Sequence, residues 1–210
     1  METKKHKLMI IGAGGHGRVI ADMAASTSQY EQIQFVDQDQ SLTKVMNYSV
    51  IHSIEEEDIL KADWIVAIGN NRIRQQQMNQ LKDKKASIAT LIHPSAILGS
   101  NVTVGAGTVV MAGVVIQCGS QIGEGCIINT SVSVDHDNII GDYVHISPGS
   151  HLAGTVTVGS NTWLGIGTIV KNNLTIGSDC QTGAGAVVVS NLTETGCYIG
   201  IPARLRKEEQ

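Results

Sequence analysis

An aliphatic residue returns every six positions through the second half of the chain, from Leu98 to Val188, without a single insertion. Only Thr182 departs from this type, and a small or apolar residue follows four positions later, with Asn138 as the one conspicuous exception. Because six is neither the helix period nor the strand period, the repeat predicts a parallel β-helix in which three units close one coil and residues eighteen apart stack. The recurring residues, here called openers, are Leu98, Val104, Val110, Ile116, Ile122, Ile128, Val134, Ile140, Ile146, Leu152, Val158, Leu164, Val170, Ile176, Thr182 and Val188.

The openers are expected to face inward as stacked aliphatic rows, and Ile92 with Ala96 fits the start of one more coil. Aromatic residues make up only 3% of the chain, which suits a narrow interior without room for rings. Glycine often follows an opener directly, and we interpret this as corners that need unusual dihedral angles or close backbone approach. These glycines are Gly99, Gly105, Gly123, Gly141, Gly159, Gly165, Gly177 and Gly183.

Short apolar runs alternate with helical patterns in the first part of the chain. They predict strands at residues 7–12, 33–37, 64–68 and 86–92, and helices after residue 17 and at residues 55–60 and 72–81. This alternation indicates a small, Rossmann-like parallel α/β sheet. His93-Pro94 marks the junction, because the residue before a proline favours an extended conformation. The predicted domains are therefore an α/β domain at residues 1–92 and an all-β parallel β-helix at residues 93–210, which ends in a C-terminal tail.

The charge balance gives no case for nucleic acid, because the net charge is −4 and the basic residues are scattered. The apolar run after the basic N-terminus stops at Gly12, which is too short for a signal peptide or a membrane span. We therefore expect a cytoplasmic location and no membrane partner. Cys126 and Cys180 share an inward row, and we interpret them as small core residues.

The stretch from Gly12 to Gly17 has the pattern G-x-G-x-x-G between a predicted strand and a predicted helix, and Asp37 follows twenty residues beyond Gly17. In this layout, amides at a helix N-terminus hold phosphates and a carboxylate holds a ribose or a base. A ligand-free tight turn, an NAD site and a site for another nucleotide-bearing ligand all fit the pattern. The half-sized domain disfavours NAD because it lacks a second mononucleotide unit. Residues 69–71 would line the same crevice.

Three histidines, His136, His145 and His151, lie close together in the repeat, and none occupies an inward position. His136 would stack one coil below Gly154, so an imidazole and a backbone N–H could converge on one reacting group. Asp135 or Asp137 could fix its tautomer and raise its basicity. The alternatives are solvated, idle side chains or a zinc site, but spacings of nine and six put the histidines on different faces, so a shared metal would need a neighbouring subunit.

Five segments carry a resemblance to a known family. They are Gly12-Ala13-Gly14-Gly15-His16-Gly17, Ile68-Gly69-Asn70-Asn71, Val134-Asp135-His136-Asp137, Ile140-Gly141-Asp142-Tyr143-Val144-His145 and Gly200-Ile201-Pro202-Ala203-Arg204. In order and spacing, they resemble the hexapeptide-repeat acetyltransferases that act on nucleotide-linked amino sugars. These are the bacillosamine and perosamine N-acetyltransferases, with the sialic acid O-acetyltransferases as cousins.

The resemblance implies a left-handed β-helix, against the general handedness of parallel crossovers. It also implies a homotrimer that binds acetyl-CoA as co-substrate in the groove between adjacent β-helices, with no metal. By the same resemblance, His136 is the general base with Asp137 beside it, although relatives often carry Glu at that position. The residues implied to contact acetyl-CoA are His145, Gly154, Ile166 and Ala184, and those implied to hold the nucleotide sugar are Gly14, Gly15, His16, Asp37, Gln38 and Gly69.

The predicted activity is transfer of acetyl from acetyl-CoA to the 4-amino group of a UDP-4-amino-4,6-dideoxy sugar of the UDP-N-acetylbacillosamine type, a step in polysaccharide biosynthesis. We expect direct attack rather than an acyl-enzyme, because no cysteine is predicted to lie beside a histidine and a carboxylate. One alternative is O-acetylation of a sialic acid or similar sugar. Another, of a different class, is a zinc-dependent trimeric hydratase or a structural β-helix protein.

Overall fold

The computed structural model describes residues 5–54 and 59–206. The chain divides into two compact units, which meet in sequence between Pro94 and Ser95, and each is described by itself. None of the described helices combines the length and the apolar composition that crossing a bilayer requires.

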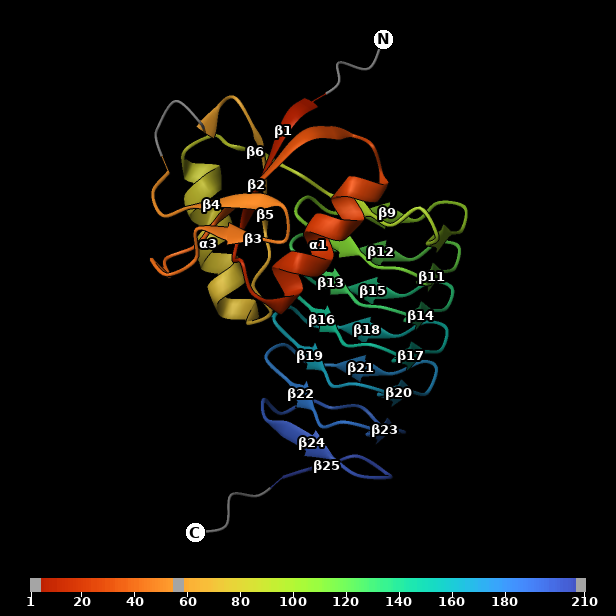
Figure 1. The fold of residues 1–210 in the computed structure, drawn as a ribbon. Coiled ribbons are helices and arrows are strands. Elements are labelled where there is room, and N and C mark those ends of the chain that lie inside the picture. The colour runs from red at the N-terminus through yellow and green to blue at the C-terminus, as the bar shows by residue number, and fades with distance from the viewer. Residues whose placement is uncertain (1–4, 55–58, 207–210) are drawn as a thin grey trace. The chain divides into compact units, whose positions relative to one another are not determined.

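The first unit is an α/β fold with one mixed β-sheet, in which β1 lies between β2 and β5 (Figure 1). The strand order is β3-β4-β2-β1-β5-β6, and all pairs are parallel except β3 with β4. Leu8, Met9 and Ile10 on β1 are fully buried, as expected for a central parallel strand covered on both faces. The elements are β1 Lys5–Ile11, α1 Gly15–Ser26, β2 Tyr30–Val36, β3 Lys44–Val45, β4 Tyr48–Ile51, β5 Asp63–Val66, α3 Asn71–Asp83 and β6 Ser87–Ile88.

The predicted α/β elements are present, with three differences. The hairpin of β3 and β4 was not predicted, because strands of two and four residues are too short to show a clear alternation of apolar and polar positions. The single strand predicted at residues 86–92 was wrong: β6 pairs with β5, and β7 (Leu91–Ile92) is a separate strand after a break. The Ala89 amide donates to the Trp64 carbonyl at 2.8 Å, which extends the bonding between this segment and β5 one residue past β6 before β7 begins. The helix predicted at residues 55–60 lies mainly outside the described residues.

The second unit is the predicted left-handed parallel β-helix, in which strands of two residues, or three in β24, stack in three sheets (Figure 1). The pairing is parallel throughout except between β24 and β25 at the C-terminal end of one sheet. We call these sheets face 1 (β10, β13, β16, β19, β22, β24 and β25), face 2 (β8, β11, β14, β17, β20 and β23) and face 3 (β9, β12, β15, β18 and β21). Their strands are β8 Ile97–Leu98, β9 Thr103–Val104, β10 Val109–Val110, β11 Val115–Ile116, β12 Gln121–Ile122, β13 Ile127–Ile128, β14 Ser133–Val134, β15 Ile139–Ile140, β16 His145–Ile146, β17 His151–Leu152, β18 Thr157–Val158, β19 Trp163–Leu164, β20 Ile169–Val170, β21 Thr175–Ile176, β22 Gln181–Thr182, β23 Val187–Val188, β24 Cys197–Ile199 and β25 Arg204–Leu205.

The register confirms the eighteen-residue stacking rule. Ile128 pairs with Ile146, and Ile146 pairs with Leu164, so each opener lies above the opener one coil earlier. The openers from Val110 onward are buried, whereas Leu98 and Val104 in the first coil are only half-buried. Packing of stacked aliphatic side chains therefore forms the core of this unit.

The corners decide between the two predicted roles of the glycines that follow openers. None of these glycines has a positive φ, and most of them allow close backbone approach: a methyl group on Gly99 would lie 2.6 Å from the backbone nitrogen of Cys118. Gly177 is an exception, because a methyl group there would come no closer than 3.3 Å to a neighbouring segment. The left-handed conformation falls instead three residues after every opener except Val188, and side chains other than glycine adopt it at about half of these positions. The residues are Asn101, Gly107, Gly113, Gly119, Gly125, Ser131, Asp137, Tyr143, Gly149, Thr155, Asn161, Gly167, Asn173, Asp179 and Gly185.

Candidate active site

His136 and Asp137 form a pair on the corner between β14 and β15, at the edge where face 2 meets face 3. The Nδ1 atom of His136 lies 2.8 Å from Oδ2 of Asp137, and both side chains are more than half exposed. A proton on Nδ1 shared with this carboxylate leaves the Nε2 lone pair available as a base. Of the two aspartates that the sequence left open, the contacting one is Asp137.

Gly154 lies one coil above His136 on the same edge, as the stacking rule predicted. The Thr155 amide donates to the His136 carbonyl at 2.9 Å, which fixes the spacing of the two corners. A methyl group on Gly154 would overlap the His136 Nε2 atom and lie 2.6 Å from Cε1, so the imidazole occupies the space that a side chain would fill. Within the described residues, the N–H of Gly154 has no hydrogen-bond acceptor.

Cys118 lies one coil below His136, which contradicts the expectation that no cysteine neighbours a histidine and a carboxylate. The Asp137 amide donates to the Cys118 carbonyl at 3.1 Å, and the Cys118 side chain is exposed. The stacking rule, applied downward from His136, would have found this neighbour. In the part of the chain that the structure describes, the Cys118 thiol makes no hydrogen bond to His136.

His145 points out of the β-helix, as predicted, but it is not solvated. It is only 9% exposed, and its ring stacks on Trp163 with the ring centroids 5.6 Å apart and the planes 3° from parallel. Its Nε2 lies 3.2 Å from the Asn129 side-chain amide, and the Trp163 indole N–H donates to the Ser147 hydroxyl at 2.8 Å. The sequence analysis missed Asn129 and Trp163, although the eighteen-residue spacing of His145 and Trp163 signals the stack.

Ile166 and Ala184 lie on a different edge from His136 and Gly154. Both are exposed on corners between face 1 and face 2, one coil apart, and the Gly185 amide donates to the Ile166 carbonyl at 2.8 Å. A single β-helix therefore brings His136, Asp137 and Gly154 together, but it keeps them apart from Ile166 and Ala184. His151 lies on face 2, where its Nδ1 is 2.8 Å from the Ser133 hydroxyl and its side chain is exposed.

The glycine-rich turn of the first unit forms the uncapped N-terminus of α1. Gly14 is the N-cap residue with an extended backbone, no side chain caps the helix, and its first turn holds no acidic residue. Gly12 has a φ of +102°, and Gly17 lies so close to the Gly12 carbonyl that any side chain there would overlap it. The exposed Gly14 and Gly15 therefore present helix-terminal amides, which favour an anion.

The Asp37 carboxylate is already engaged by the backbone. Its Oδ2 accepts from the Ala13 amide at 2.7 Å, and its Oδ1 accepts from the Asp39 amide at 3.0 Å. Asp37 therefore fixes the glycine-rich turn against the loop after β2, a role that the sequence did not predict. Gly69 is exposed after β5, and its carbonyl accepts from the Arg74 guanidinium at 3.1 Å.

A cavity of about 520 Å³ opens at the carboxyl ends of β1, β2 and β5, where α/β sheets bind ligands. The predicted residues Asp37 and Gln38 line it together with Gly12. Several further lining residues were not predicted as site residues; apart from Ile68, which belongs to the Ile68-Gly69-Asn70-Asn71 segment, they come from elements with no motif of their own. These are His52, Ile54, Ile68, Ile73, Gln77 and Lys84.

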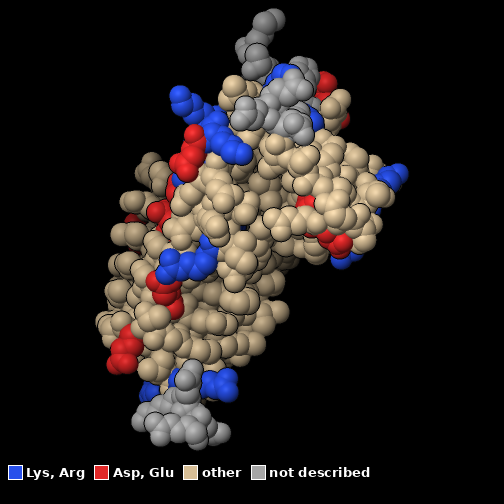
Figure 2. All heavy atoms as spheres, turned by 90° about the vertical axis from the view of Figure 1, so that its left-hand side faces the viewer, with Lys and Arg blue, Asp and Glu red and all other residues tan. Residues whose placement is uncertain are grey.

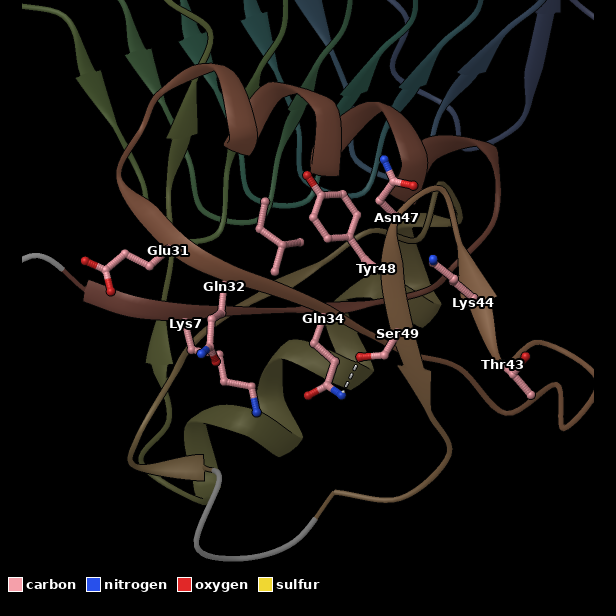
Figure 3. A pocket seen from close by; sticks show the side chains of 10 residues that line it. Lys7, Glu31, Gln32, Gln34, Thr43, Lys44, Asn47, Tyr48 and Ser49 are labelled. Carbon is pink, nitrogen blue, oxygen red and sulfur yellow. Dashed lines mark hydrogen bonds between the residues drawn. The ribbon is translucent and has the colours of Figure 1, made fainter.

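A second cavity, of about 500 Å³, lies over β2 and β4 and is lined mainly by polar side chains, including Gln34 and Ser49, which share a hydrogen bond of 2.9 Å (Figure 3). No predicted site residue lines it. On the face shown in Figure 2, acidic and basic side chains are interspersed, which agrees with the scattered charges in the sequence.

His16, at the start of α1, is held in its neutral form. Burial, with a further contribution from the nearby Arg74 guanidinium, lowers its pKa from 6.5 to about 4. Arg74 is itself buried, and it donates to the carbonyl of Ile68 and to the side chain of Asn71, both at 2.8 Å. The buried Nε2 of His16 has no hydrogen-bond partner among the described residues, so a bound ligand could supply one.

The neutral state of His16 predicts a loss of stability in mild acid. The unfolded chain protonates this histidine near pH 6.5, whereas the folded chain does so only near pH 4, so acidification across this window favours unfolding. The contribution is about 3 kcal/mol, from 1.4 kcal/mol per pKa unit. In denaturant titrations between pH 7 and pH 4, the free energy of unfolding should fall less for His16→Gln than for the wild-type chain. The exposed His151→Gln is the matched control, and equal pH slopes for His16→Gln and wild type would contradict this account.

Several known proteins are closely similar to this chain. The structure matches the acetyltransferase domain of PglB from Neisseria gonorrhoeae in complex with acetyl coenzyme A, with a TM-score of 0.91 and 38% identity over 96% of this chain and all of that one. It matches PerB from Caulobacter crescentus in complex with CoA and GDP-perosamine with a TM-score of 0.89 and 38% identity, covering 96% and 97% of the two chains. UDP-N-acetylbacillosamine N-acetyltransferase from Bacillus subtilis is 37% identical over 109 residues, 49% of this chain and 50% of that protein.

The first unit has its own match, because residues 7–81 fit the model of the PglD N-terminal domain family. The two solved structures extend the likeness over both units at an identity that shows common descent as well as a common fold. The expected resemblance is thereby confirmed. The chain belongs to the family of hexapeptide-repeat acetyltransferases that act on nucleotide-linked amino sugars, together with the bacillosamine and perosamine N-acetyltransferases.

Proposed function

We propose that the chain transfers acetyl from acetyl-CoA to the 4-amino group of a UDP-4-amino-4,6-dideoxy sugar, with His136 as general base. The observation that carries this proposal is the exposed His136–Asp137 pair directly below the Gly154 amide. Related proteins act on or bind nucleotide-linked amino sugars, and two solved relatives hold acetyl coenzyme A or CoA. Family and geometry together therefore support an amine acceptor and a thioester donor.

In the proposed reaction, the sugar amine attacks the thioester carbonyl carbon and forms the new C–N bond. His136 takes the amine proton on Nε2 while Asp137 holds Nδ1, a role worth roughly 10² to 10⁴ in rate. The carbonyl oxygen becomes an oxyanion, which the Gly154 N–H stabilises by about 2.7 to 4 kcal/mol. When the C–S bond breaks, the imidazolium returns its proton to the CoA sulfur, so both proton and electron pair are accounted for.

We propose direct attack, without an acyl-enzyme. Cys126 and Cys180 are buried, and burial raises the pKa of the Cys180 thiol, which disfavours its thiolate. Cys118 is exposed next to the His136 corner, but its thiol makes no hydrogen bond to the imidazole in the described structure. A cysteine nucleophile needs such a base in reach.

For the acceptor, we propose that the first unit binds the nucleotide. The uncapped N-terminus of α1 would hold the diphosphate through Gly14 and Gly15, and the cavity lined by Asp37 and Gln38 would take the nucleoside. His16 directly follows Gly15, and Gly69 follows β5, at whose carboxyl end the cavity opens. Neutral His16 would offer Nε2 to the substrate. We place the reaction in the cytoplasm, in polysaccharide synthesis, because activated sugars and acetyl-CoA are cytoplasmic metabolites.

We also propose a homotrimer, in which acetyl-CoA lies between neighbouring β-helices. Three of the predicted acetyl-CoA contacts lie on face 1 or on the edge between face 1 and face 2; these are His145, Ile166 and Ala184. Gly154 lies on the edge between face 2 and face 3. A second copy could bring these two halves together. Large apolar side chains exposed on the outer faces also favour burial against another copy: Ile139 is 51% exposed and Ile169 is 47% exposed.

An activity assay over a panel of acceptors tests the proposed function. Release of free CoA thiol should be fastest, by kcat/KM, with a UDP-linked 4-amino sugar and absent with the corresponding 4-hydroxy sugar. A preference for GDP-perosamine, which the likeness to PerB favours as the second candidate, would keep N-acetylation but replace the nucleotide. Activity on free sialic acid alone would overturn the proposal.

A further inference from the structure

Asn138 occupies an inward position of the β-helix at which the other coils carry small or apolar residues. It lies four residues after the opener Val134 and is fully buried. Its side chain forms hydrogen bonds to four backbone groups, so neither end of the buried amide lacks a partner. An amide buried in an aliphatic core is costly unless it is satisfied in this way.

Part of this bonding belongs to the architecture. Ser120, Ser150 and Thr162 occupy the same position in other coils, and each hydroxyl accepts from the amide eighteen residues ahead and donates to the carbonyl fifteen residues ahead. Asn138 makes the same two contacts, because Oδ1 accepts from the Val156 amide and Nδ2 donates to the Ala153 carbonyl, both at 3.1 Å. A serine or threonine could make them equally well.

The other two contacts hold the corner that precedes Asn138. In the same row, Thr168 donates to the carbonyl three residues earlier and Cys126 to the carbonyl two residues earlier, whereas Asn138 makes both contacts in addition to the architectural pair. Its Nδ2 also donates to the Asp135 carbonyl at 2.7 Å and to the His136 carbonyl at 3.3 Å. A hydroxyl has one proton, so it cannot donate both to the carbonyl fifteen residues ahead and to the corner behind it. The amide has two protons, which serve the three carbonyls with one proton shared between two of them. The additional N–H of asparagine, which serine lacks, therefore bonds the backbone of the corner that carries His136.

The contact to Ala153 has a second consequence. The carbonyl of Ala153 and the N–H of Gly154 belong to one peptide group, in which a trans bond makes them point in opposite directions. Because the carbonyl points inward to Asn138, the Gly154 N–H is directed outward, on the side where the His136 ring lies over Gly154. One buried amide thus holds the peptide of the proposed oxyanion donor and the corner of the proposed base.

We infer that Asn138 is a positioning residue that fixes His136 and the Gly154 N–H relative to each other; this rests on the proposed roles of those two groups. Asn138→Ser retains a hydroxyl for the architectural contacts and loses those to Asp135 and His136. We expect kcat to fall by roughly 10- to 100-fold, the effect of a small misplacement of catalytic groups. KM for both substrates should change little, because Asn138 is buried and contacts neither.

Thr162→Val is the matched control, because it removes architectural contacts of the same kind at another edge, away from His136. It should lower the melting temperature at least as much as Asn138→Ser while retaining wild-type kcat. If Asn138→Ser fails to fold, Asn138→Thr replaces it, since threonine is accommodated at this position in other coils.

Measurement of kcat, both KM values and the melting temperature for these variants, with His136→Ala in the same series, separates the possible failures. A kcat of Asn138→Ser equal to that of Thr162→Val, with His136→Ala inactive, would overturn the role of Asn138 alone. An active His136→Ala would instead overturn the proposed function. A low kcat with unchanged KM in Asn138→Ser, but not in Thr162→Val, is the expected result.

Discussion

Gly154→Ala is expected to lower kcat by about 100-fold or more and to leave the melting temperature close to that of the wild-type chain. The added methyl group would occupy the position of the His136 Nε2 atom. Because the His136 side chain is 58% exposed, its ring can rotate into solvent, so the fold accommodates the methyl group at little cost. The same rotation removes the proposed base from the Gly154 amide and from Asp137. Steady-state kinetics with acetyl-CoA and an amino-sugar acceptor, beside thermal melting, measure both effects.

Gly177→Ala is the matched control for this variant. Gly177 also lies on a corner of the β-helix, but its added methyl group would come no closer than 3.3 Å to any atom. It should retain wild-type kcat. If Gly154→Ala were as active as Gly177→Ala, the imidazole position seen over Gly154 would not be the working one.

The β-helix could be predicted because its repeat is local and unbroken. A six-residue period fixes which side chains face inward, and three units per coil place residue 136 below residue 154 without any further information. The same rule places Cys118 below His136, so this neighbour also follows from the sequence. The backbone dihedrals of the corners could not be predicted in the same way, because a glycine is compatible both with close backbone approach and with a positive φ. The structure shows that different glycines serve these two purposes.

Side-chain burial on the outer surface could not be predicted from the period. The pattern shows that His145 points outward, but its burial depends on the rotamer of Trp163, which lies flat on the imidazole. Likewise, the sequence singled out Asn138 as an exception without giving its partners, because these are backbone carbonyls of two different coils.

The first unit was predictable at the level of its elements and less so at the level of its site. The glycine-rich turn and Asp37 fall at the carboxyl ends of β1 and β2, as the spacing indicated. The spacing could not show that both Asp37 oxygens already hold backbone amides, or that the buried Arg74 lies near His16. Such roles arise from contacts between segments that are far apart in the sequence.

The central claim is that His136 removes the proton from the attacking amine. The variant His136→Ala lacks the imidazole that is hydrogen-bonded to the Asp137 carboxylate and lies against Gly154. Among the described residues, no other imidazole has both neighbours. Its side chain is exposed and supports no packing, so the fold and the oligomeric state should be unchanged. Cys118→Ala, one coil below, removes the remaining candidate nucleophile on the same edge and should retain wild-type activity.

The most direct test is therefore the kcat of His136→Ala at neutral pH, with saturating acetyl-CoA and amino sugar, beside Cys118→Ala and the wild-type chain. We predict a fall of roughly 10² to 10⁴ for His136→Ala and no change for Cys118→Ala. A wild-type kcat in His136→Ala would contradict the account, whatever the activity of the cysteine variant.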